Sequence, residues 1–181
     1  MRESGCRGIV ADALFIAVLS MAACASSAKP APANAATPPA GGREALVVIH
    51  EMQAEPFRED EPFRAKQAAL IKWVEGSPDV TVIVCEGLLP KLDVDARPHD
   101  GVLLFQSMFG QAAYLIEHAG APPRDEAVFT SGLVAAVGAY RKLLVVHPEE
   151  RQTAWDQLDA AERKNELSPH VRSSIQGCLK P

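Results

Sequence analysis

The amino-acid sequence predicts an α/β fold, in which a small parallel β-α-β unit is covered by three to four C-terminal helices. Two short apolar runs rich in β-branched residues, 45–49 and 80–85, have the composition of strands buried on both faces. The segment between them has apolar residues at helical spacing and is long enough to connect parallel strands. The rest of the chain shows helical periodicity, which predicts the covering layer.

The predicted crossover helix occupies residues 60–77. Asp60 and Pro62 are typical of a helix start, and the Gly-Ser-Pro sequence from Gly76 ends the helix. Helical spacing predicts further helices over 102–118, 124–146 and 148–164, followed by a short last helix. The second of these is apolar over the widest face and is expected to be central. Because two strands make a very small sheet, we expect a third strand near 88–94 or a partner that completes it.

The first 23 residues have the pattern of an export signal. Arg2 and Arg7 precede an apolar stretch that is too short to span a bilayer comfortably. The stretch ends in Met-Ala-Ala-Cys at 21–24, which resembles the lipobox of bacterial lipoproteins, although that family prefers Leu where Met21 stands. The resemblance implies cleavage before Cys24 and lipid attachment to it. The alternative is a secreted or periplasmic protein released by an ordinary signal peptidase.

Residues 24–42 fit a tether between lipid and body. The segment is rich in Ala and Pro and has no large apolar side chain to bury, so burial cannot offset the conformational entropy lost on ordering. The expected organisation is a signal peptide at 1–23, a lipidated Cys24 with its tether, and one globular domain at 43–181. By analogy with sorting patterns, the expected location is the outer membrane, facing the periplasm.

Two cysteines, Cys85 and Cys178, remain in the body of the chain. Export places them in an oxidising compartment, where they can form a disulfide. Two buried free thiols are the alternative. The formal net charge of −5 argues against a nucleic-acid partner, because such proteins normally present a basic face.

Polar residues follow both predicted strands. His50 and Glu51 come directly after the first strand, and Glu86 follows the second. Parallel neighbouring strands would bring these side chains to one edge of the sheet, where ligands of open α/β folds bind. Such a set can hold a divalent metal, or His50 can act as a base oriented by Glu86.

These residues resemble the Tiki/TraB superfamily, which includes haem-binding uptake lipoproteins and erythromycin-esterase-like hydrolases. The likeness consists of a strand ending in His50, a helix with Phe63-Arg64-x-Lys66-x-x-x-Leu70, and a strand ending in Glu86. The family has glycine where this chain has Val47. The resemblance implies an α/β fold, with His50 and Glu86 as site residues in haem or metal handling or in hydrolysis.

Three functions are therefore expected of an envelope lipoprotein. The first is a binding or scaffold domain, not an enzyme, that holds a metal or haem at His50, Glu51 and Glu86. The second is a periplasmic hydrolase of the Tiki/TraB or erythromycin-esterase type. The third is a structural lipoprotein whose helix at 124–146 docks another envelope protein.

Overall fold

The body of the protein is a bundle of α-helices. The computed structural model describes residues 40–85 and 87–178, and these contain no β-strand. The predicted α/β fold is therefore wrong. The elements are α1 (Gly42–Ala54), α2 (Glu61–Gly76), α3 (Asp100–Glu117), α4 (Glu126–Val146), the short 3-10 helix η1 (Pro148–Glu150), α5 (Thr153–Arg163) and α6 (Leu167–Ile175).

The first predicted strand, 45–49, lies inside α1. Ala45, Ile49 and Met52 are buried, which is the i, i+4, i+7 spacing of one helix face, whereas Val47 is 69% exposed. A short apolar run is compatible with either a buried strand or a buried helix turn, and β-branched residues prefer strands only weakly. The helical spacing extends past the run to Met52, so the helix buries a longer face than a five-residue strand would.

The second predicted strand, 80–85, is a segment without regular structure in the connection between α2 and α3. It has no strand to pair with, because the other β-like run is helical. Val80 and Cys85 are buried, and the Ile83 amide donates to the Gln111 side-chain oxygen at 3.2 Å. A side chain of α3 thus takes one backbone hydrogen bond that a strand would have given to its neighbour. The third strand considered near 88–94 is likewise absent.

The helices predicted from residue 60 onward are confirmed, with one difference in their boundaries. Asp60 caps α2 by accepting from the Phe63 amide at 3.1 Å, and Asp125 caps α4 by accepting from the Ala127 amide at 3.2 Å. The segment expected as one helix over 148–164 is divided into η1 and α5, with Arg151 extended between them. The sequence located α2 through its start at Asp60 and α4 through the spacing of its apolar residues.

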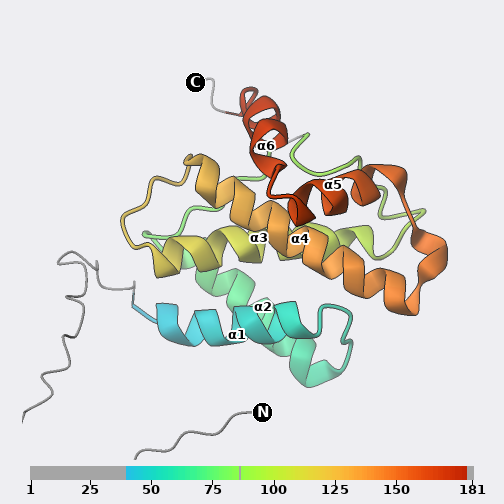
Figure 1. The fold of residues 1–181 in the computed structure, drawn as a ribbon. Coiled ribbons are helices and arrows are strands. Elements are labelled where there is room, and N and C mark those ends of the chain that lie inside the picture. The colour runs from blue at the N-terminus through green and yellow to red at the C-terminus, as the bar shows by residue number, and fades with distance from the viewer. Residues whose placement is uncertain (1–39, 86, 179–181) are drawn as a thin grey trace, which may run out of the picture. The chain divides into compact units, whose positions relative to one another are not determined.

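The central pair is α3 and α4, which share the most extensive interface between two helices. Figure 1 shows them between the α1–α2 pair on one side and α5 and α6 on the other. They approach closely at two glycines: a Cβ atom on Gly110 would lie 2.5 Å from the Ser131 carbonyl oxygen, and one on Gly132 would lie 2.7 Å from that of Ser107. Only glycine allows the two backbones to cross at this distance.

Among the described residues, α4 is the one helix that is long and apolar enough to cross a membrane. Half of its most apolar stretch is buried inside the protein. Phe129, Leu133 and Val137 are fully buried. A central helix of a folded domain has the same length and composition, and α4 occupies that place here.

The joint between α4 and α5 is built around Tyr140. Its ring stacks on Trp155 at a centroid distance of 5.5 Å, and its hydroxyl donates to Asp156 at 3.1 Å and accepts from the Gln152 amide at 2.9 Å. Burial raises the pKa of Tyr140 above its ordinary value, and the hydrogen bond to Asp156 adds to the rise. The phenol therefore stays protonated and remains a donor to α5.

Candidate functional site

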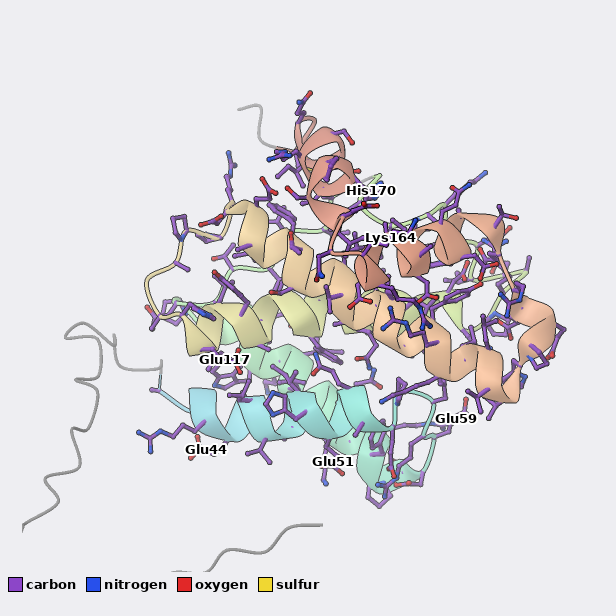
Figure 2. The ribbon with its side chains drawn as sticks, in the orientation of Figure 1. Glu44, Glu51, Glu59, Glu117, Lys164 and His170 are labelled. Carbon is purple, nitrogen blue, oxygen red and sulfur yellow. A yellow bond between two sulfur atoms is a disulfide. The ribbon has the colours of Figure 1, made fainter. Side chains whose placement is uncertain are left out.

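The described residues contain no sheet edge at which the predicted site residues could meet. His50 is exposed on α1, and no hydrogen bond or ion pair joins it to another described residue. Glu51 is ion-paired with Lys66 of α2 at 2.7 Å, at the surface (Figure 2). Glu86 and Cys24 lie outside the described residues. Without strands, the argument that brought His50 and Glu86 together no longer holds.

His50 instead lines a shallow hollow of about 360 Å³ between α1, α3 and α4. Its walls are mostly small residues, with polar groups such as Lys142 at the rim. The Lys142 ammonium donates to the carbonyl oxygens of Gln53, at 2.5 Å, and Ala54, at 2.8 Å. Lys142 thereby caps the C-terminus of α1, so its charge already has a structural role. Within the described parts of the chain, no group of three or more His, Cys, Asp and Glu is placed to hold a metal ion.

A larger pocket, lined mainly by apolar side chains, lies between α3 and the connection that precedes it. Its volume is about 570 Å³, within the range of small-molecule sites. One wall consists of residues 84–85 and 87–92, which we call the wall segment, and the opposite side is α3. The apolar side chains that line it are Val84, Leu88, Leu89, Pro90, Leu92, Leu104 and Met108.

Two polar side chains of α3 form the floor of this pocket. Ser107 and Gln111 are one helical turn apart and are 3% and 1% exposed. The oxygen of the Gln111 amide holds the Ile83 amide, so Gln111 fixes the start of the wall segment to α3. Both residues pack against α4 at Gly132, where the Gln111 Cγ atom would be 2.8 Å from an added Cβ atom. The close crossing of α3 and α4 therefore positions the floor.

The wall segment is also attached to the C-terminal helix. A disulfide joins Cys85 to Cys178, with the two Cα atoms 5.8 Å apart. His170 of α6 donates from Nε2 to the Leu88 carbonyl oxygen at 3.0 Å, and Figure 2 shows His170 near the start of α6. Cys85 and Leu88 are 6% and 1% exposed, so both anchors are buried. The pocket is thus held open by covalent and polar links rather than by a sheet.

A cluster of histidine and glutamate side chains lies outside the pocket, where the connection to α3 meets η1. His99 Nδ1 and Glu150 are 2.5 Å apart, and the ring of His99 stacks on that of His147 at 4.7 Å. His147 Nδ1 in turn lies 3.1 Å from the Glu149 carboxylate, and a backbone hydrogen bond to this carboxylate, together with the one to His147, lowers the pKa of Glu149. The group joins three segments of the chain. The Nδ1 atoms of His99 and His147 each contact a glutamate of η1, so the two rings connect η1 to the start of α3 and the end of α4.

The sequence analysis did not identify the pocket. Two features of the sequence could have indicated it: Ser107 and Gln111 interrupt the apolar face of α3 one turn apart, and the Gly-Leu-Leu-Pro-Lys-Leu segment at 87–92 is apolar although it cannot be helical around its proline. Apolar residues in a connection need a surface to cover, and here that surface is α3.

No protein-family model, curated protein or solved structure matches this chain.

Proposed function

We propose that this protein is an exported, lipid-anchored binding protein of the cell envelope, and that its helical body binds a small apolar ligand in the pocket between the wall segment and α3. The pocket is the observation that carries the binding role. It combines about 570 Å³ of space with seven apolar side chains and a few buried polar groups, which is the composition of small-molecule sites. The lipobox-like sequence ending at Cys24 and the Ala/Pro-rich tether support the anchor.

The anchor predicts acylation at Cys24. When the full chain is expressed in a bacterial host supplied with labelled palmitate, we expect the label on the wild-type protein and on Cys6→Ser, because Cys6 would be removed with the signal. Cys24→Ser should carry none. A mature N-terminus other than residue 24, with no label on the wild-type chain, would show ordinary secretion instead.

The pocket predicts that the folded chain binds a medium-length alkyl compound. The full chain carrying Cys24→Ser, which has no attached acyl group, should bind 1-decanol in a calorimetric titration with a negative heat-capacity change, because apolar surface is buried on binding. Met108→Trp places an indole in the pocket and should weaken decanol binding by about tenfold or more, since several buried methylenes at about 0.8 kcal/mol each lose their place.

Val47→Trp is the matched control, because it adds the same indole at a 69% exposed position on α1. It should bind decanol as the parent does. Circular dichroism and thermal unfolding establish that both variants are folded. Equal decanol affinity in the parent and in Met108→Trp would locate binding elsewhere and remove the proposal.

A further inference from the structure

The polar side chains of the pocket show which end group a ligand would carry. Lys91, Ser107 and Gln111 are the polar side chains among its described lining residues, and these residues include no Asp, Glu or His. Lys91 is a donor that carries a positive charge, the Ser107 hydroxyl can donate, and the Gln111 amide already uses its oxygen for Ile83. The described lining therefore suits a hydrogen-bond acceptor or an anion.

The three groups lie at different depths. Ser107 and Gln111 are almost fully buried on α3, whereas Lys91 is exposed. A carboxylate placed deep in the pocket would lose its hydration, which costs several kcal/mol, whereas one near Lys91 keeps contact with water. The apolar end of a ligand thus belongs inside and its charged end at the rim.

The backbone of Lys91 is held in place. Arg97 donates to the Lys91 carbonyl oxygen at 2.9 Å and pairs with the fully buried Asp100 at 2.8 Å. Asp100 also accepts from the Asp93 amide at 2.7 Å, two residues beyond Lys91. The turn that carries Lys91 is therefore anchored to the first residue of α3, on the helix that forms the floor.

We infer that the ligand class of this pocket is a free fatty acid, with its alkyl chain between the wall segment and α3 and its carboxylate beside Lys91. This inference rests on the proposed function and adds the chemistry of the end group. The complementary charge at the rim and the apolar interior are the two properties that select an alkyl carboxylate over an alcohol, an ester or an amine.

The test compares four ten-carbon compounds with the same full Cys24→Ser chain: decanoate, 1-decanol, methyl decanoate and decylammonium. Decanoate should bind about three- to fivefold more tightly than the alcohol or the ester, the size expected of one partly exposed ion pair. Decylammonium should bind most weakly. Added sodium chloride should reduce the preference, because salt screens exposed charges.

The deciding variant is Lys91→Gln, which should remove the three- to fivefold preference for decanoate and leave decanol affinity unchanged. Lys72→Gln, an exposed lysine on α2, is the control and should keep the preference. If the preference survives in Lys91→Gln, or if all four compounds bind equally to the parent chain, the inference is overturned and the apolar pocket of the proposed function stands. If none binds, both are overturned.

Discussion

Substituting alanine for Gly110 is expected to lower the free energy of unfolding by about 3 kcal/mol, the upper part of the range for overpacking a core. The new methyl group would meet the Ser131 carbonyl oxygen at 2.5 Å, the Ala135 Cβ at 2.7 Å and the Gly132 Cα at 3.0 Å. Two of these atoms belong to the α4 backbone and the third, the Ala135 Cβ, is attached directly to it, so none of the three can rotate away. The helices must therefore separate, and every side chain packed between them loses contact.

Gly138 provides the matched control for this prediction. It also lies within α4, but a Cβ atom added there would have no neighbour within 4 Å. Gly138→Ala should raise the free energy of unfolding by about 0.5–1 kcal/mol, because alanine is the better helix former. Urea unfolding monitored by circular dichroism measures both variants. Equal stability of Gly110→Ala and Gly138→Ala would show that the two helices do not cross at glycine.

Gly110→Ala is also expected to alter the pocket, because the position of the pocket floor depends on the crossing of α3 and α4. Ser107 and Gln111 pack against α4 at Gly132. Moving α3 away from α4 should shift the floor relative to the wall segment. We expect the decanol affinity of folded Gly110→Ala to fall as well, whereas Gly138→Ala should bind as the parent does.

Removal of the disulfide between Cys85 and Cys178 is expected to cost about 3–4 kcal/mol of unfolding free energy. The bond closes a loop over a sequence separation of 93. A constraint of that length removes much entropy from the unfolded chain: the loop-entropy treatment gives about 4–5 kcal/mol, and engineered bonds often deliver less. The bond also joins the wall segment to the turn that follows α6, so its loss should release one side of the pocket.

The variants Cys85→Ala and Cys178→Ala should be destabilised equally, since either breaks the same bond. A full chain that carries Cys6→Ser and Cys24→Ser isolates the pair: a thiol reagent should label no cysteine before reduction and two after reduction and unfolding. Decanol should bind more weakly to the reduced protein. Two reactive thiols in the native, unreduced chain would contradict the prediction.

Sequence patterns located four of the six α-helices well, because their positions follow from local chemistry. The cap at Asp60 and the stop after Gly76 act within one helical turn and do not depend on the rest of the fold. The wide apolar face over 124–146 predicted a central helix, and α4 is central. Local signals were sufficient for these elements.

The two apolar β-branched runs were misassigned for a related reason. Over five or six residues, a strand buried on both faces and a helix covered on most sides have the same continuous apolar sequence pattern. The predicted site at His50, Glu51 and Glu86 depended on pairing the two runs. Because residues 45–49 belong to α1, no partner strand exists for 80–85, and the described residues form no sheet edge at which a site could assemble.

The amino-acid sequence by itself determined where most helices begin and end, since caps, stops and the spacing of apolar residues act between near neighbours. It also predicts the export and lipid attachment of the chain. Only the tertiary structure decided that residues 80–85 and 87–92 are neither strand nor helix, and that the wall segment forms one side of a pocket. That outcome depends on partners far along the chain, namely the Gln111 side chain, Cys178 and His170. A segment without regular structure makes its backbone hydrogen bonds and apolar contacts with residues of the packed helices. The sequence of the segment itself does not specify which residues these are.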